Sequence, residues 1–272
     1  MNYRLFSIGA AWGLCMTQLM SVFSKEENFV LMNGSTHAII DELGPHVDTR
    51  ISPCSTFKTT LSLRGYDAGI LQDEQSPIWD VQKGYDDYLP SWKGSLTPQA
   101  WMQYSCLWYS KLLSLRLGEE NIQSYLDAFA YGNRDISEGL VPPGPKNPPW
   151  IGSSLTISPK EQVEFIHKMI SKQLPISRHA LEMTRALVFK EQLPEGWKLF
   201  GKTGYSGSYI TQDGQILEHG WFVGWLEKED QFFSFAYLIR DQKIDLDQRI
   251  PRAKQLLVES HIMDELLRDD DI

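Results

Sequence analysis

Cysteine and positive charge are both scarce in this sequence, and each shortage excludes a class of protein. Only three cysteines occur in 272 residues, and none belongs to a C-x-x-C pair, which excludes the disulfide scaffold of small secreted domains. Lys and Arg number 26 against 35 Asp and Glu, which gives a net charge of −9. Such an acidic chain is not typical of proteins that bind nucleic acid or anionic membranes, so we expect neither partner.

Histidine is also sparse, with six residues in the chain. No two of them stand four residues apart and none has a cysteine partner, so the sequence predicts no metal site. We expect the histidines at or near the surface. Repeats and low-complexity segments are absent, and a content of 42% hydrophobic and 12% aromatic residues excludes disorder. A folded enzyme or binding protein with a sizeable core remains.

The one long stretch with little charge lies at the N-terminus. Between Met1 and Ser24 the single charge is Arg4, and an apolar run of about a dozen residues follows it. This run is shorter than the roughly 20 residues that a membrane span requires. It therefore predicts a secretory signal peptide over residues 1–24 and no stable membrane anchor, with an amphipathic or buried helix as the alternative. We expect a periplasmic protein of residues 25–272.

Predicted strands lie at the two ends of the chain and predicted helices in the middle. The runs 29–32 and 38–40 flank Asn33-Gly34, a dipeptide that favours a tight hairpin turn, and residues 131–150 are a Gly- and Pro-rich loop. Further strands are expected over 197–204, 220–227 and 231–239. Helices are expected over 55–68, 97–117, 121–129, 158–172, 177–190 and 252–267.

This order of elements predicts one domain with a mixed α/β (α+β) fold. Residues 25–58 and 192–272 would share an antiparallel sheet flanked by helices, because strands occur at both ends of the chain. Residues 59–191 would form a mainly helical second lobe.

Ser55 and Lys58 stand three residues apart at the start of an expected helix, a spacing that places both side chains on one face. A serine hydroxyl needs an adjacent base to act as a nucleophile, and an ordinary lysine is protonated at neutral pH. Burial beside Phe57 and Leu61 would lower the pKa of the amine. Taken alone, the pair is also compatible with a helix-capping serine and a solvated lysine.

Lys202-Thr203-Gly204 lies on an expected strand and offers donors to a carboxylate or an oxyanion. Together with an upstream Ser-x-x-Lys it is typical of β-lactamases and penicillin-binding proteins. The same residues also complete a phosphate-loop pattern that begins at Gly196. We reject that pattern, because the loop-like residues before it and Gly204 after it do not supply the required strand and helix.

The order and spacing of these motifs resemble those of the class D β-lactamases, the oxacillinases. Ser105 follows the first pair, Tyr131-Gly132-Asn133 opens the long loop, and Trp150 closes it. Tyr-Gly-Asn in place of Ser-Asp-Asn points to class D rather than class A. The resemblance covers nearly the whole chain after residue 24. It implies a serine β-lactamase/transpeptidase-like fold and hydrolysis of β-lactam antibiotics through a serine acyl-enzyme.

The resemblance also implies roles for individual residues. Ser55 would be the nucleophile, and Lys58, N-carboxylated by CO2, would be the general base. Trp150 would donate its indole N–H to this N6-carboxylysine, and Ser105 would relay a proton to the leaving nitrogen. The backbone N–H groups of Ser55 and Tyr205 would form the oxyanion hole. Beyond CO2 no cofactor is expected.

Further residues are expected to line the substrate site. Arg249, or Arg252 as a near alternative, would bind the substrate carboxylate. Leu107 and Ile151 differ from the valine and leucine usual in the family, which leaves the substrate profile open. The other expected lining residues are Tyr131, Asn133, Lys202, Thr203 and Gly204.

Several alternatives stay open at this point. A β-lactam-sensing or penicillin-binding domain would be acylated without turnover, and a cell-wall transpeptidase is a weaker candidate. Cys54 and Cys106, each next to a proposed active-site serine, would form either a disulfide or two buried free thiols. The protein would be a monomer or a homodimer.

Overall fold

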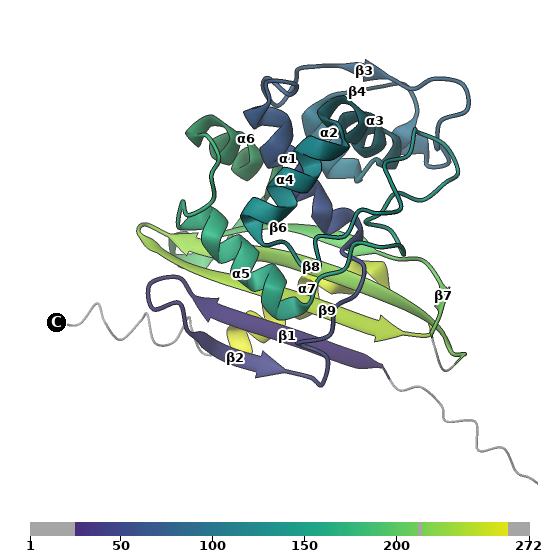
Figure 1. Cartoon of the computed structure of the whole chain (residues 1–272). Coiled ribbons are helices and arrows are strands. Elements are labelled where there is room, and N and C mark those ends of the chain that lie inside the picture. The colour runs from purple at the N-terminus through teal and green to yellow at the C-terminus, as the bar shows by residue number, and fades with distance from the viewer. Residues whose placement is uncertain (1–24, 212–213, 261–272) are drawn as a thin grey trace, which may run out of the picture.

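A central antiparallel sheet organises the molecule, as the computed structural model shows for residues 25–211 and 214–260 (Figure 1). The strands run in the order β2-β1-β9-β8-β6-β5, and β7 pairs with β8. The sheet strands are β1 (Glu26–Asn33), β2 (Ile39–Leu43), β5 (Phe189–Gln192), β6 (Lys198–Tyr205), β7 (Tyr209–Ile210), β8 (Ile216–Lys228) and β9 (Gln231–Asp241). N-terminal β1 thus pairs with C-terminal β9, which confirms the predicted shared sheet.

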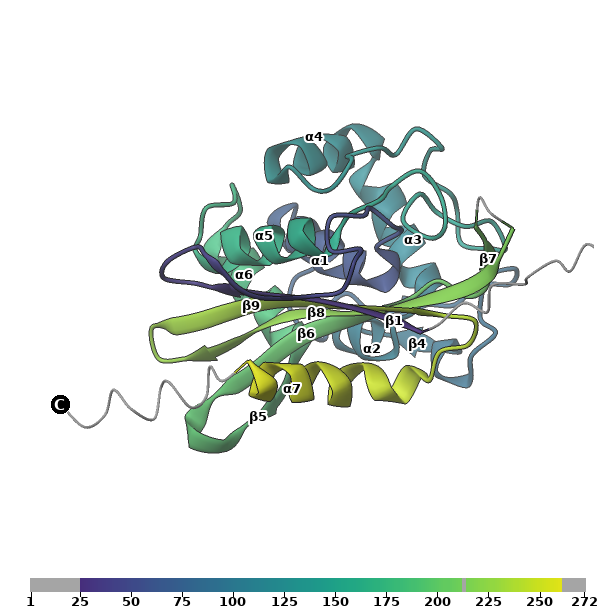
Figure 2. The same ribbon diagram turned by 90° about the horizontal axis from the view of Figure 1, so that it is seen from below.

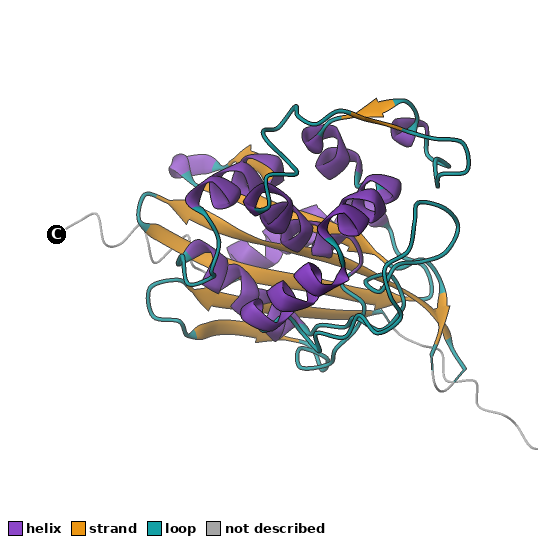
Figure 3. Ribbon diagram, turned by 45° about the horizontal axis from the view of Figure 1, so that its top comes forward, coloured by secondary structure: helices purple, strands orange, loops and turns teal. Residues whose placement is uncertain are grey.

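Helices cover both faces of this sheet unequally (Figure 2). One face carries α7 (Arg249–Glu259). The remaining helices gather on the other side, together with the short hairpin β3 (Trp79–Asp80) and β4 (Ser95–Leu96) (Figure 3). They are α1 (Lys58–Asp67), α2 (Pro98–Tyr104), α3 (Leu107–Leu117), α4 (Glu119–Phe129), α5 (Pro159–Ile170) and α6 (Arg178–Val188).

The alternation of side chains along the strands produces two hydrophobic cores. On β1, Val30 and Met32 belong to the larger core under the helical lobe, whereas Phe29 and Leu31 belong to the core under α7. Successive residues of a strand point to opposite faces, so one apolar run serves both layers. Because the sheet is buried on both faces, β1 reads as a continuous hydrophobic segment.

Side-chain caps fix three helix starts where the sequence predicts them. Thr97 accepts a hydrogen bond from Ala100 N, and Ser177 accepts one from Ala180 N. Ser158 and Glu161 form a complete capping box at the start of α5. Each cap satisfies a backbone N–H that the first helical turn leaves without a partner, so these starts are encoded locally.

The predicted helix over 97–117 is wrong in one respect, because the chain breaks at Ser105 into α2 and α3. Ser105 adopts a left-handed conformation with φ of 57°, which no helix can continue. The break coincides with a tertiary contact of the Ser105 hydroxyl, described below, which the helix propensity of residues 97–117 does not predict.

The first hairpin and the last helix also differ from the prediction. Five residues separate β1 from β2, so the tight two-residue turn is wrong; Asn33 instead accepts hydrogen bonds from the backbone of Ser35 and Thr36. Helix α7 begins at Arg249, three residues early, and its predicted end lies outside the described residues, as does the predicted signal peptide. In the described ranges, no helix is long and apolar enough to cross a membrane.

Candidate active site

The first turn of α1 brings the predicted nucleophile and base together. Ser55 lies in a 3-10 turn, Cys54–Phe57, that leads directly into α1. Lys58 Nζ donates a hydrogen bond to Ser55 Oγ at 3.2 Å. Lys58 is fully buried, as are its neighbours Phe57 and Leu61. The solvated-lysine alternative is therefore wrong.

Burial changes the chemistry of the Lys58 amine. Desolvation lowers the pKa of Lys58 from 10.5 to about 8, and the Lys111 charge acts in the same direction. Cys106, Asp86 and Cys54 oppose the shift. The dominant cause is the loss of water around the charged form. Part of the Lys58 population is therefore neutral near pH 7.

A second serine–lysine pair joins the helical lobe, through Ser105, to strand β6, through Lys202. Lys202 Nζ donates to Ser105 Oγ at 3.0 Å and to the carbonyl oxygen of Thr203 at 3.0 Å. Burial, together with the nearby charge of Lys58, lowers the pKa of Lys202 well below its ordinary value. The break between α2 and α3 thus aims Ser105 at β6, and the two lysines lie close enough to affect each other.

Trp150 carries a buried indole N–H donor. Its Nε1 is enclosed and has no hydrogen-bond partner in the described part of the chain, although its ring packs 5.1 Å from that of Phe57. Buried N–H groups are nearly always paired. Trp150 packs on Phe57, the residue before Lys58, and a carbamate on the Lys58 amine would offer an anionic acceptor for this N–H. The residues present therefore fit a carboxylated lysine.

Strand β6 closes tightly on the turn that carries Ser55. A Cβ atom at Gly204 would lie 2.9 Å from Pro53 O and 3.3 Å from Cys54 Cβ, so only glycine permits this approach. Arg249 Nη1 donates to Gly204 O at 2.7 Å. Arg252 instead pairs with Glu27, its Nε lying 3.2 Å from Oε1. Of the two arginines, Arg249 is therefore the one beside the Lys202-Thr203-Gly204 strand.

The Tyr131-Gly132-Asn133 segment fastens the long loop. Asn133 Nδ2 donates to Ser154 O at 2.7 Å, and its Oδ1 accepts from Thr156 N at 3.0 Å. Gly132 has φ of +53°, and a Cβ there would lie 2.1 Å from Thr156 O. The buried Tyr131 ring lies 5.5 Å from that of Phe57. The Asn133 amide is thus engaged by loop backbone.

The two residues that depart from the family pattern are both apolar contacts. Leu107 is buried in the larger core, and the partly buried Ile151 packs against the same core. Cys54 and Cys106 are free buried thiols, so the disulfide alternative is wrong. Burial raises the pKa of each thiol to about 12, which keeps both protonated.

His219 and Ser52 were not anticipated from the sequence. His219 Nε2 lies 2.9 Å from Ser52 O and 3.4 Å from Cys54 Sγ, and burial lowers its pKa to about 4. The expectation of surface histidines is wrong here and for His167, since both are 2% exposed. No sequence pattern marks His219 or Ser52, because Trp150 and His219, the partners of Ser52, lie 98 and 167 residues away in the chain.

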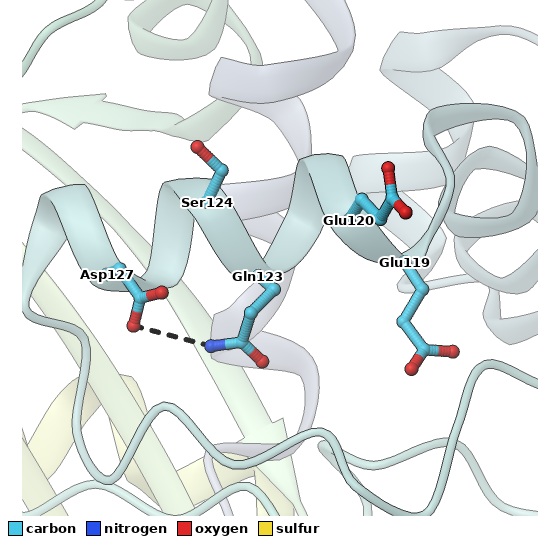
Figure 4. Close-up of a pocket in the computed structure, with 5 residues that line it drawn as sticks. All are labelled: Glu119, Glu120, Gln123, Ser124 and Asp127. Atoms are coloured by element: carbon cyan, nitrogen blue, oxygen red, sulfur yellow. Dashed lines mark hydrogen bonds between the residues drawn. The ribbon is translucent and has the colours of Figure 1, made fainter.

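The described residues do not support two other kinds of functional site, a metal centre and a second pocket for an anionic ligand. In residues 25–211 and 214–260, no three His, Cys, Asp or Glu side chains are grouped to hold a metal ion. A surface hollow runs along α4 (Figure 4), but its carboxylates would repel an anionic ligand. It is lined by Glu119, Glu120, Gln123, Ser124 and Asp127.

Comparison with known proteins adds an independent line of support. Residues 25–263 match the family model of the penicillin binding protein transpeptidase domain. Beta-lactamase OXA-9 of Klebsiella pneumoniae is 37% identical over 222 residues, covering 79% of this chain and 80% of that protein. Beta-lactamase OXA-1 of Escherichia coli is 36% identical over 200 residues, covering 73% and 70%.

A solved structure agrees with these relatives. The crystal structure of the OXA-427 class D β-lactamase superposes with a TM-score of 0.76 at 34% identity, covering 89% of this chain and 99% of that one. The chain therefore belongs to the penicillin-binding protein transpeptidase family and, within it, to the class D β-lactamases.

Proposed function

We propose that this protein hydrolyses β-lactam antibiotics through an acyl-enzyme on Ser55. The observation that carries the proposal is the 3.2 Å contact between Lys58 Nζ and Ser55 Oγ, with the lysine side chain fully buried. A buried, partly neutral amine is able both to accept a proton and to react with CO2. A solvated lysine at this spacing would do neither at neutral pH.

In acylation, Ser55 Oγ attacks the lactam carbonyl carbon while its proton passes toward Lys58. The lactam C–N bond then breaks, and Ser105 donates its hydroxyl proton to the leaving nitrogen while it takes a proton from Lys202 Nζ through the hydrogen bond between them. The N–H groups of Ser55 and Tyr205 would hold the oxyanion, and the Gly204 contact with the Ser55 turn keeps the two segments adjacent.

Deacylation needs a base that is unprotonated at neutral pH. A carbamate on Lys58 would supply that base for the attacking water. Trp150 supports this assignment, because its Nε1–H is buried without a partner in the described residues. Phe57, Lys58 and Trp150 are all fully buried, and the two aromatic rings pack 5.1 Å apart.

The positive side chain of Arg249, beside the end of β6, suits an anionic substrate. Thr203 neighbours Lys202, and Arg249 is fixed at Gly204 by one guanidinium nitrogen, so the guanidinium lies beside the strand expected to bind the carboxylate. We assign carboxylate binding to Arg249 rather than Arg252, which Glu27 holds elsewhere. We also propose that residues 1–24 direct secretion to the periplasm.

Turnover measurements test the function. Penicillin, oxacillin and a carbapenem are mixed with the protein with and without bicarbonate, and hydrolysis is followed by absorbance. Many molecules should be hydrolysed per protein, faster with bicarbonate. One stoichiometric acylation with no release would instead identify a sensing or penicillin-binding domain.

Replacing Lys58, the proposed base, tests its role in turnover. Lys58→Ala should lower the deacylation rate by about 10²–10⁴-fold, the usual contribution of a general base, and mass spectrometry should then detect any acyl-enzyme that accumulates. The exposed Lys198 provides the control as Lys198→Ala. Wild-type turnover in Lys58→Ala would remove Lys58 as the base.

A further inference from the structure

Ser52 joins two segments that carry different parts of the site. It lies three residues before Ser55 and is 5% exposed. Its hydroxyl donates to Trp150 O at 2.7 Å and accepts from Gly152 N at 2.9 Å. One side chain therefore bonds the backbone on both sides of Ile151, next to the indole proposed to hold the carbamate.

The Ser52 carbonyl is held from β8. Trp221 Nε1 donates to it at 2.9 Å, and His219 Nε2 lies at the same distance. A carbonyl only accepts, so Nε2 carries a proton. Burial lowers the pKa of His219 to about 4, which keeps the ring neutral at pH 7. The Tyr209 ring meets the imidazole edge-on at 5.4 Å. The imidazole is thus enclosed and fixed.

The chain between Ser52 and Ser55 needs such support. Cys54 is a non-glycine residue with φ of +52°, a conformation that persists only where surrounding contacts impose it. Its N–H donates to Trp150 O at 2.9 Å, the same carbonyl that Ser52 Oγ binds. The orientation of the Ser55 N–H and the position of Trp150 therefore depend on one shared set of hydrogen bonds.

We propose that Ser52 and His219 are positioning residues of the hydrolytic reaction. Through these bonds they lock the turn carrying Ser55 to the segment carrying Trp150, whose N–H would bind the Lys58 carbamate. The inference rests on the proposed function, since it concerns retention of the Lys58 carbamate. Neither residue touches the substrate; both act through Trp150 and Ser55.

Ser52→Ala tests the bridge while leaving the carbonyl contacts in place. It should raise the bicarbonate concentration for half-maximal turnover about tenfold, because both buried hydrogen bonds of the hydroxyl, to Trp150 O and from Gly152 N, are lost, and saturating bicarbonate should restore most of kcat. The carbamate signal of ¹³C-labelled enzyme should weaken in parallel. Ser62→Ala is the control, because its buried hydroxyl bonds Thr184 at 2.8 Å between α1 and α6.

A pair of variants at His219 tests the second contact. Gln carries an amide N–H at about the position of Nε2, so His219→Gln should keep the bicarbonate requirement within about twofold of wild type. His219→Leu removes the donor and should raise the requirement as Ser52→Ala does. Thermal unfolding of all four variants separates folding losses from this effect.

The outcomes separate the two proposals. If wild type turns over with bicarbonate dependence but Ser52→Ala and His219→Leu match it, the positioning role is overturned while the function stands. Melting temperatures that fall without a change in bicarbonate requirement would likewise reduce both residues to structural roles. A wild type without turnover would overturn the proposed function itself.

Discussion

Burial gives Lys58 a reactivity that its side chain lacks in water. With a pKa of about 8, about one amine in ten is neutral at pH 7, against roughly one in three thousand for a lysine at its ordinary pKa. Neutral amine is the form that reacts with CO2 and accepts protons. The apolar ring of Phe57 beside it therefore contributes to the chemistry without touching a reacting atom.

The unpaired indole of Trp150 leads to a prediction at the residue scale. Trp150→Phe keeps an aromatic ring against Phe57 but removes the N–H that would bind the carbamate. We expect turnover in ambient CO2 to fall about 10- to 100-fold, the cost of a lost hydrogen bond to a buried anion. High bicarbonate should recover part of it. An unchanged bicarbonate response would exclude Trp150 from carbamate retention.

The buried His219 makes stability depend on pH. Burial lowers its pKa from 6.5 to about 4, so between these values the unfolded chain binds a proton that the folded chain does not. Stability should therefore fall as the pH falls through this window, by about 2.5 kcal/mol between pH 7 and pH 4.5. Urea unfolding should show a loss in His219→Gln that is smaller than the wild-type loss by about this amount, because the other groups that titrate in this range are unchanged. Equal losses would contradict the assignment.

At the scale of single elements, local signals were sufficient for helix starts and insufficient for breaks. Thr97, Ser158 and Ser177 cap helices where expected, because each acts on a backbone group three residues away. At the break, Ser105 accepts a hydrogen bond from Lys202, 97 residues distant, and no local pattern contains that information. The Ser52–His219 contact escaped prediction for the same reason.

An element-scale prediction concerns the anchor between α3 and the long loop. Lys111 Nζ lies 3.0 Å from Asp86 Oδ2 and donates to Gly144 O at 2.6 Å, while Gly144 N donates to Asp86 Oδ1 at 2.9 Å. Both charges are buried. Lys111→Met should lower the free energy of unfolding by about 3–5 kcal/mol, because it leaves Asp86 buried without its partner.

Two further variants show whether the charge is the cause. The double variant Lys111→Met, Asp86→Leu should be more stable than Lys111→Met alone, since no charge remains buried. The surface pair Lys168–Glu164 is the control, and Lys168→Met should cost no more than about 0.5 kcal/mol. Urea unfolding measures all three. A double variant as unstable as the single one would argue against an unpaired charge.

For the whole molecule, the arrangement of the chain links the two lobes. Strand β1 lies between β2 and C-terminal β9, so the helical middle of the sequence is inserted within one sheet. The order of predicted elements indicated both the sheet and the second lobe, because strand patterns occur at the two ends of the chain and helix patterns in the middle. The packing of α5 on β1 and β9 did not follow from the sequence, since helix periodicity predicts which face of a helix is buried but not the element against which it packs.

This connectivity predicts that the two lobes unfold together. Neither lobe closes its core alone, because the larger core joins Trp101 and Trp108 of the helices to Trp221 and Trp225 of the sheet. Urea unfolding followed by tryptophan fluorescence and by far-ultraviolet circular dichroism should give one coincident transition. Acylation of Ser55 by a slowly released β-lactam should shift both curves equally. Separate midpoints, or a shift of only one signal, would mean that the helical lobe folds independently of the sheet.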